Sequence, residues 1–421
     1  GRLVNNYQSN LNYMKMPGSP KRITPQKILP TMENLLSKSY QNNPELNSAR
    51  SAVKAADEQL PQALAGYLPR LTGNYSAEYT ESGSSTGPSE SFSPNSLSLN
   101  ADVELFGGGE TYYAIKAAEE NIISSRFDLK STEQDFLLRA INAYIEVIFA
   151  KKVLDLSKNN EKVLGEQLKA TTQRYVIGDA TRTDVAQSEA RLANAVSDRV
   201  IAEGDYINAK SVFKRVFLID PPEYLPMPKS LPKFPEKFEQ ALRVALDNNP
   251  TLLSTKYRLE ENEYLEKVER SQLFPQVDLQ GSISERESVS GNNLIDTESE
   301  TIGLNVSVPL YNSGRTYSAM REARDRISQS YMDYQNTINE VHSNLIQTWQ
   351  NLNTTATNIE ATKSSLVASE YALEGVREEQ KEGVRSILDV LDAEQERFSA
   401  EVRHARAIKD SILAVYQLKS V

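Results

Sequence analysis

The 421-residue sequence contains no cysteine and only two histidines. The lack of cysteine excludes disulfides, thiolate metal sites and thiol nucleophiles, so cysteine usage does not indicate a redox compartment. His342 and His404 each stand alone among charged residues on predicted helices, where neither completes a catalytic triad or a set of metal ligands. The sequence therefore predicts a protein that is not an enzyme and that carries no metal or cofactor.

Long apolar runs are also missing, although a membrane-spanning helix needs roughly 20 apolar residues. The apolar stretch 140–150 is too short and contains Asn142 and Glu146. Any entry into a membrane would therefore have to use strands. The opening segment GRLVNNYQSN lacks the apolar region of a signal peptide, as expected of a processed chain.

The sequence has no basic cluster, and its formal net charge is −10 at pH 7. Nucleic acid is therefore not expected as a partner. A mean hydropathy of −0.51 is low for a chain with one large packed core. Because 25% of the residues are charged and the pattern is periodic, the surplus polar surface indicates an elongated structure rather than disorder.

The most informative feature is a repeated glycine-containing segment, Arg174–Asp184 and Glu379–Asp389. Gly178 and Gly383 each interrupt a long helical pattern that then starts again, which is typical of the tip of a helical hairpin. The two glycines are 205 positions apart (383 minus 178), as are Asp184 and Asp389. The chain is therefore an internal duplication. The second helices are expected to begin at Thr183 and Ser386.

The duplication divides the chain into four parts. Residues 1–30 form an N-terminal arm, 31–218 the first repeat, 219–235 a linker with six prolines, and 236–421 the second repeat. Each repeat is expected to contain short helices, a strand hairpin (71–106 or 277–311), a long helix (110–175 or 315–381), a tip and a returning helix. The long helices carry apolar residues every seven positions and would each be roughly 100 Å long.

Both expected hairpins alternate apolar and polar residues with the period of a strand. A transmembrane barrel needs this pattern, with apolar side chains toward lipid and polar ones toward a lumen. Four strands are too few to close a barrel, so strands would have to be pooled between chains. The apolar side chains of each strand are expected to face lipid, among them Tyr75, Leu99, Leu279 and Val306. A soluble sheet packed on helices is the alternative.

The motifs NNPEL, YLPRL, LFGGGE, LYNSGR, RYVIGDATRTDV and EGVRSILDVLDAEQ resemble those of the TolC family of outer-membrane efflux and secretion channels. The resemblance covers about residues 31–421 and places the chain in the bacterial outer membrane, extending into the periplasm. It implies an α+β fold in which a homotrimer builds a 12-stranded β-barrel and a long α-helical barrel. It also implies a periplasmic adaptor and an inner-membrane transporter as partners, for drug efflux or type I protein secretion.

The resemblance also assigns roles at the tips. Arg385 and Asp184 look like partners in links that hold the periplasmic entrance closed, and Asp389 and Asp392 look like aspartate rings at the aperture. Arg385, Asp389 and Asp392 are spaced i, i+4 and i+7, which predicts one face of the last helix. Gln380 stands where the family has a gate tyrosine. The contacts that hold the entrance closed are therefore expected to be weaker here, or to be made by other residues.

Three other interpretations remain open from the residues. The tip charges could simply be solvated pairs within one helix. A trimeric surface adhesin also pools four strands per chain, but it places them all at one C-terminal end. A soluble coiled-coil scaffold would account for the helices without a membrane.

Overall fold

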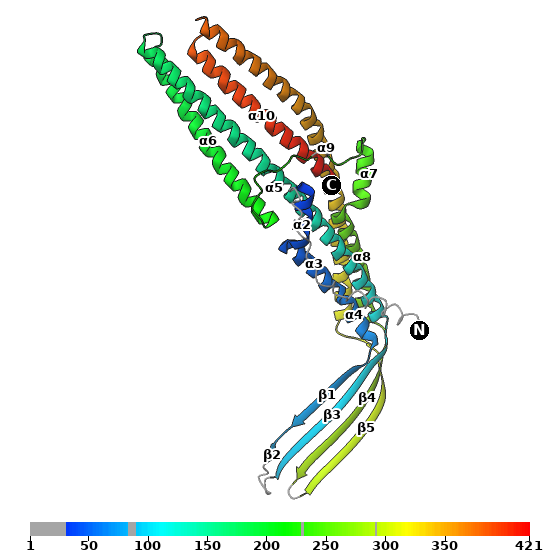
Figure 1. Ribbon diagram of the computed structural model, residues 1–421. Helices are drawn as coiled ribbons and strands as arrows, with labels where there is room; N and C mark the ends of the chain where they lie inside the picture. Colours follow the sequence, from blue (N-terminus) through cyan, green and yellow to red (C-terminus); the bar gives the residue numbers. More distant parts are fainter. Residues whose placement is uncertain (1–30, 83–89, 229–230, 291–292) are drawn as a thin grey trace.

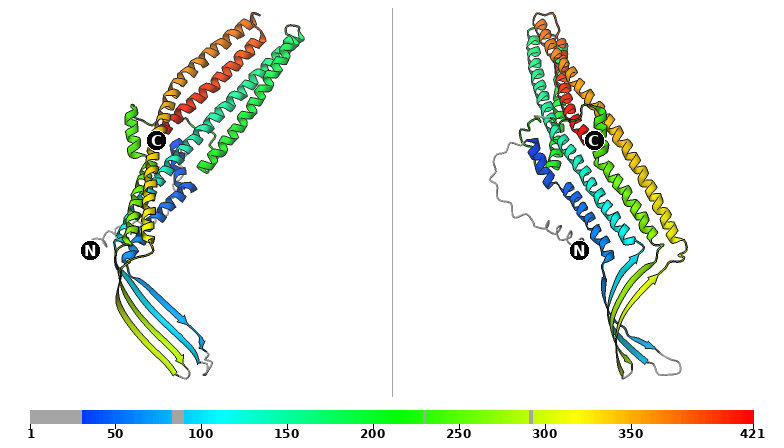
Figure 2. Two further views of the ribbon diagram at one scale, coloured as in Figure 1. Left: turned by 180° about the vertical axis from the view of Figure 1, so that it is seen from behind. Right: turned by 90° about the vertical axis from the view of Figure 1, so that its right-hand side faces the viewer.

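The computed structural model describes residues 31–82, 90–228, 231–290 and 293–421. The predicted arm, residues 1–30, lies outside the described residues, as does part of the loop expected between the first two strands. The molecule is long and narrow, with a sheet at one end and two helical hairpin tips at the other (Figure 1). The two hairpins extend in the same direction from the middle of the molecule, as Figure 2 shows from behind and from the side.

Two helices of 67 residues each form the length of the molecule, α5 (Glu110–Val176) and α9 (Arg315–Lys381). At 1.5 Å per residue each is about 100 Å long, which confirms the expected dimension. Each is preceded by a glycine in the left-handed region, Gly109 at φ 93° and Gly314 at φ 77°. Only glycine enters this conformation without steric cost, so the strand-to-helix turn is determined locally.

Shorter helices lie end to end along the long ones. Toward the sheet, α3 (Pro44–Asp57) and α4 (Gln59–Leu64) pack on α5, and α8 (Pro250–Ser271) packs between α5 and α9. Toward the tips, α6 (Arg182–Phe217) pairs with α5, and α10 (Ile387–Ser420) packs on α9 and α5. The short helices α2 (Met32–Asn42) and α7 (Phe238–Asn248) flank the middle.

The helical region between α2 and β1 is not one continuous helix. Helix α3 ends at Asp57, α4 follows, and a 3₁₀ turn covers Ala65–Tyr67. The cause is Pro61, which has no N–H to bond to the carbonyl of Asp57 and so cannot continue an α-helix through that turn.

The sheet is antiparallel in the order β1-β3-β4-β5: β1 (Arg70–Ala77), β3 (Glu90–Gly107), β4 (Gln276–Ser290) and β5 (Asn293–Ser307), while the short β2 (Thr80–Ser82) also pairs with β3. Within the hairpin expected over 71–106, strand β3 already begins at Glu90. The second hairpin, expected to run to residue 311, ends at Ser307, since Pro309 cannot donate to a strand ladder.

The core is divided into clusters along the rod rather than gathered in one place. One cluster joins the middle of α5 to α2 and α6 and contains Phe136, Tyr144 and Phe213. The Tyr144 hydroxyl donates to the carbonyl of Pro226 at 2.6 Å, which holds the linker against α5. A second cluster joins α7, α9 and α10, and Trp349 packs against it. Neither cluster is large, as the low mean hydropathy predicted.

Candidate functional site

The first tip is built by a capping box. The N-cap of α6 is Thr181, whose hydroxyl accepts from the backbone N–H of Asp184 at 3.2 Å. The Asp184 carboxylate in turn accepts from the backbone N–H and the hydroxyl of Thr181, both at 2.8 Å. The prediction that this helix begins at Thr183 was therefore wrong, because only a threonine three residues before the aspartate can close the box.

The second tip repeats this geometry 205 positions later. Ser386 is the N-cap of α10, and the Asp389 carboxylate accepts from its backbone N–H at 2.9 Å and its hydroxyl at 2.7 Å. These hydrogen bonds to Ser386 lower the pKa of Asp389, with a smaller contribution from the nearby Arg385. The start of the helix at Ser386 is confirmed. In both tips the aspartate at this position already has a structural task.

Arg385 precedes the N-cap, so it is not part of α10. The expectation that it shares one face of that helix with Asp389 and Asp392 was wrong for this reason. Its Nε donates to Glu379 Oε2 at 2.8 Å, across the turn formed by Gly383. Within one chain Arg385 is therefore not brought to Asp184. The half-buried Gln380 accepts through its backbone carbonyl from the N–H of Gly383 at 3.1 Å.

The structure adds charged contacts that sequence reasoning missed. Arg191 on α6 forms an ion pair with Asp392 on α10, which links the two hairpins of the chain. Glu394, with a side chain only 4% exposed, is held by Arg377 and, at 3.6 Å, by Arg397. Arg191 and Asp392 are 201 positions apart in the sequence, so local spacing carried no signal for the link between them.

Both tips also expose apolar side chains. Val176 and Ile177 in the first tip and Val384 in the second are more than 70% exposed, with values of 78%, 79% and 74%. Gly178 and Gly383 have φ values of 86° and 78°, which confirms that the left-handed turns need glycine. The tips therefore combine rigid turns with an apolar surface at the extreme end of the rod.

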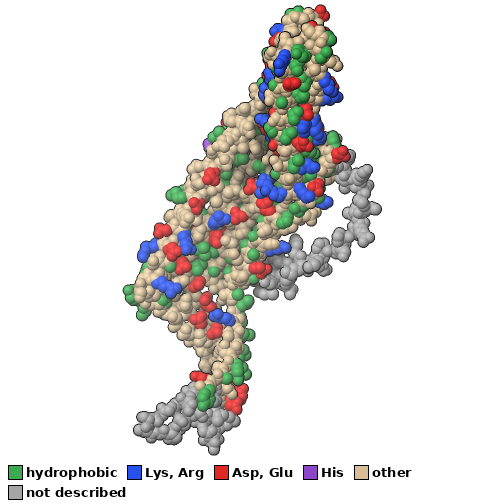
Figure 3. All heavy atoms as spheres, turned by 90° about the vertical axis from the view of Figure 1, so that its left-hand side faces the viewer, with side chains coloured by type: hydrophobic (Ala, Val, Ile, Leu, Met, Phe, Trp, Pro, Cys, Tyr) green, Lys and Arg blue, Asp and Glu red, His purple; other side chains and the backbone are tan. Residues whose placement is uncertain are grey.

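The opposite end of the molecule has two chemically different faces. In the strand register Tyr75 lies opposite Leu97, Leu99 opposite Ile283, and Leu279 opposite Leu304. Because residues opposite each other share a face and side chains alternate along a strand, the four residues expected to face lipid all lie on one face. They are 40–69% exposed in the single chain, and hydrophobic side chains are visible along the sheet in Figure 3.

The other face of the sheet is polar across all four long strands. Thr72, Asn100, Ser282 and Thr301 form one row across the sheet, and the next row contains Arg70, Asp102 and Gln280. The apolar face is itself limited at the end far from the helices, where Glu285 lies opposite Glu298 and Glu287 opposite Asp296. The described sheet therefore has an apolar band on one face, bordered by these acidic pairs, and rows of polar residues on the opposite face.

No described helix is long and apolar enough to cross a membrane. Among the same residues, no group of three or more His, Cys, Asp or Glu side chains is arranged to hold a metal ion.

The family described as outer membrane efflux protein matches residues 35–212 and 241–421, one segment in each repeat. The chain belongs to this family. Membership confirms the resemblance to TolC-type channels and the outer-membrane location. It also decides against the surface-adhesin and soluble-scaffold interpretations, and the role it supports is that of an efflux or secretion channel rather than an enzyme.

Individual relatives agree along nearly the whole chain. Outer membrane efflux protein BepC of Brucella suis is 29% identical over 388 residues, covering 92% of this chain and 84% of the relative. Outer membrane protein TolC of Vibrio cholerae is 24% identical over 405 residues, covering 92% and 89%. A membrane protein crystal structure from Pseudomonas aeruginosa has the same fold, with a TM-score of 0.81 at 17% identity and coverage of 96% and 99%.

Proposed function

We propose that three copies of this chain form a closed channel that exports substrates across the periplasm and the outer membrane. The observation that carries the proposal is the sheet, which has one apolar face, one polar face and two open edges at β1 and β5. In lipid an unpaired strand edge costs several kcal/mol for each backbone group, so β5 of one copy must pair with β1 of the next. Three copies would supply the 12 strands that the resemblance implies.

The helical part extends this channel away from the membrane. Helices α5 and α9 are about 100 Å long and continue directly from β3 and β5, so a closed barrel of strands would continue as a barrel of helices. The polar face of the sheet and the charged helices would line or surround water. Such a tunnel would cross the periplasm.

The hairpin tips would form the periplasmic entrance. Asp389 and Asp392 of three copies would place six carboxylates at the mouth, which favours cations there. Arg385 and Asp184 would form links between neighbouring hairpins that hold the mouth closed. The exposed apolar side chains of the tips offer a docking surface for a periplasmic adaptor, which would connect the channel to an inner-membrane transporter.

The decisive measurement combines mass and conductance. In mild detergent the folded protein should have the mass of a trimer, and in planar bilayers it should conduct ions with a preference for cations. A stable folded monomer that does not conduct would contradict the proposal. Drug export and protein export can be distinguished by supplying this channel together with either a drug transporter or a protein-secretion transporter. The pairing that restores transport identifies the kind of substrate.

A further inference from the structure

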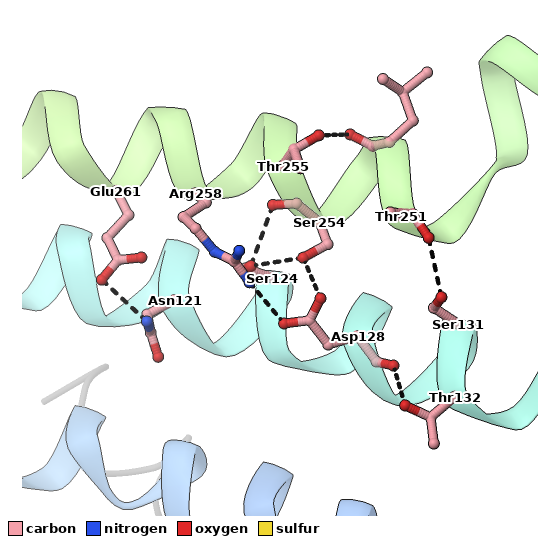
Figure 4. Close-up of polar contacts among 11 residues, drawn as sticks. Asn121, Ser124, Asp128, Ser131, Thr132, Thr251, Ser254, Thr255, Arg258 and Glu261 are labelled. Atoms are coloured by element: carbon pink, nitrogen blue, oxygen red, sulfur yellow. Dashed lines mark hydrogen bonds and ion pairs between the residues drawn. The ribbon is translucent and has the colours of Figure 1, made fainter. Parts of the chain in front are cut away.

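A groove lies in the middle of the molecule, beyond the part in which α8 packs on α5. Near the sheet these two helices are in direct contact: the hydroxyls of Ser124 and Ser254 are buried 3.1 Å apart, and Ser254 also donates to Asp128 (Figure 4). Toward the tips α6 and α10 flank α5 instead, and a groove of about 1060 Å³ lies between these three helices. Sites for small organic ligands typically have roughly 300–1,000 Å³, so the groove is large enough to hold one.

The groove is long and has an apolar lining of mostly small side chains. Ala143 and Ala150 on α5 and Ala209 on α6 are buried and line it, as does the buried ring of Phe136. The α5 residues that line the groove extend from 136 to 153, which is roughly 26 Å at 1.5 Å per residue. These dimensions suit an extended apolar chain.

The charged lining is more basic than acidic, although the whole chain has a formal net charge of −10. Four basic and three acidic side chains line the groove. Lys409 Nζ lies 3.1 Å from Glu146 Oε2, and Arg139 forms an ion pair with Glu45. Four of the seven charges therefore neutralise each other in pairs.

The three charges that remain are two arginines and one aspartate. Arg215 and Asp205 on α6 and Arg406 on α10 are exposed, and none of them forms an ion pair among the described residues. A guanidinium group binds a carboxylate or phosphate through two parallel hydrogen bonds, and these two arginines are free to do so. The groove thus combines an excess of one positive charge with an apolar surface.

The groove lies on the side of α5 that faces away from the linker. Tyr144 faces the linker, because its hydroxyl donates to the carbonyl of Pro226. Asn142 and Glu146 line the groove and lie two positions before and after Tyr144, so at about 100° per residue they are about 160° around the helix from it. In the proposed channel the linker belongs outside the helical barrel, since chain inside would obstruct the lumen. The groove therefore faces the lumen.

We propose that this groove binds an organic anion with a long apolar tail as it passes through the lumen. The apolar lining buries the tail, and Arg215 and Arg406 bind the anionic head. The inference rests on the proposed channel and deepens it, because it names a class of substrate that contacts the channel wall. The occupant is not a lipid of the membrane: Phe136 is 26 residues (136 minus 110) beyond Glu110, where α5 begins, and this is roughly 39 Å along the helix from the sheet.

Octanesulfonate is a suitable probe, because it joins an anionic head to an apolar tail and is soluble in water. Its binding is measured by isothermal titration calorimetry on the protein in lipid nanodiscs, with the heat of empty nanodiscs subtracted. We expect one site per chain. Methanesulfonate, which lacks the tail, and octyltrimethylammonium, which carries the opposite charge, should each bind more weakly by about tenfold or more.

Variants test whether the groove is the site. Arg215→Gln with Arg406→Gln should lower the affinity for octanesulfonate about tenfold, as expected for the loss of hydrogen bonds to a charged group. Arg182→Gln with Arg321→Gln is the matched control, because it removes two exposed arginines that do not line the groove. Asp205→Asn should raise the affinity severalfold, since it removes a charge of the same sign as the ligand. Each variant should keep the mass of the unmodified protein, which shows that a change in affinity does not come from misfolding.

Single-channel conductance in planar bilayers tests whether the groove faces the lumen. Octanesulfonate should reduce the conductance of the unmodified channel, and reduce it less when Arg215 and Arg406 are both replaced. A conducting trimer that binds octanesulfonate no more tightly than methanesulfonate, or equally well in both double variants, would overturn this inference and leave the channel standing. Binding without any effect on conductance would overturn the luminal site. A monomer that does not conduct would overturn both proposals.

Discussion

The two repeats share a scaffold but not its charges. Both tips have a glycine at positive φ followed by a capping box, at Gly178 and Thr181 in one and at Gly383 and Ser386 in the other. Only the second tip contains an arginine bonded across the turn, since the counterpart of Arg385 is Ala180. Duplication has therefore preserved the residues that shape the backbone, while surface charges have diverged. We therefore interpret the shared residues as structural. The residues that differ between the repeats are the candidates for control of channel opening.

The largest effect is expected where the repeats are equivalent and face the membrane. Leu99 and Leu304 correspond to each other, lie on the apolar face and are 51% and 61% exposed. Replacing either with arginine should cost roughly 2–4 kcal/mol near the bilayer midplane. Their neighbours Asn100 and Asn305 lie on the polar face, where arginine should be tolerated. The measurement is the free energy of unfolding from lipid vesicles, and equal costs on the two faces would show that the facing assignment is wrong.

The glycine turns should respond equally in both repeats. A Cβ added at Gly178 or Gly383 would meet nothing within 4 Å, so the only cost of alanine is the left-handed backbone. That cost is about 1–2 kcal/mol for either variant. Thermal unfolding of Gly178→Ala and Gly383→Ala measures it, with Gly204→Ala, inside α6 and equally unobstructed, as the control that should gain stability. Unequal losses of stability in the two variants would show that the two turns differ in more than their similar dihedral angles indicate.

The charged difference should affect conductance rather than stability. An exposed ion pair contributes only about 0–1 kcal/mol, so Arg385→Ser should barely change unfolding. If the arginine helps to close the mouth, single-channel conductance in planar bilayers should rise severalfold. Arg182→Ser, an exposed arginine in the first turn of α6, is the matched control and should leave conductance unchanged. Equal responses in both variants would contradict a special role for the second tip.

Carboxylates at the mouth predict a separate change in ion selectivity. Asp389→Asn with Asp392→Asn should lower cation preference, measured as the reversal potential in a salt gradient. Because Asp392 also pairs with Arg191, the single variant Arg191→Gln is needed to separate loss of the link from loss of the ring. Unchanged selectivity in the double variant would leave these aspartates as structural groups only.

The tips show which parts of the structure could be predicted from the sequence. Glycine, proline and capping residues act within a few positions, so the helix boundaries were predicted to within one or two residues at most ends. Ser386 and Asp389 are three residues apart, and Thr181 and Asp184 have the same spacing in the first tip. The prediction of a helix start at Thr183 did not use this spacing. Contacts such as Arg191 with Asp392 depend on how the two hairpins pack, which no local pattern encodes.

The smallest predicted effect concerns a carboxylate on α5, near Glu260 of α8, that has no equivalent glutamate in the second repeat. Glu120 lies on α5, and its counterpart 205 positions later is Asp325. One oxygen of Glu120 is buried with no hydrogen-bond partner among the described residues. Burial raises the pKa of Glu120, and the charges of Glu260 and Glu119 raise it further. The surroundings of Glu120 therefore destabilise its charged form relative to its protonated form.

A pKa above the ordinary carboxyl value means that the folded state binds the proton more tightly than the unfolded chain. Stability is then lowered at neutral pH and recovered as the pH falls through the folded pKa. Glu120→Gln should accordingly raise the thermal midpoint at pH 7 and lose that advantage below about pH 4, where the carboxyl is protonated in both states. Glu203→Gln is the control, because Glu203 lies on α6, accepts from Arg199 at 2.9 Å and should bring no gain. An advantage of Glu120→Gln that persists at low pH would mean that packing, and not charge, is responsible.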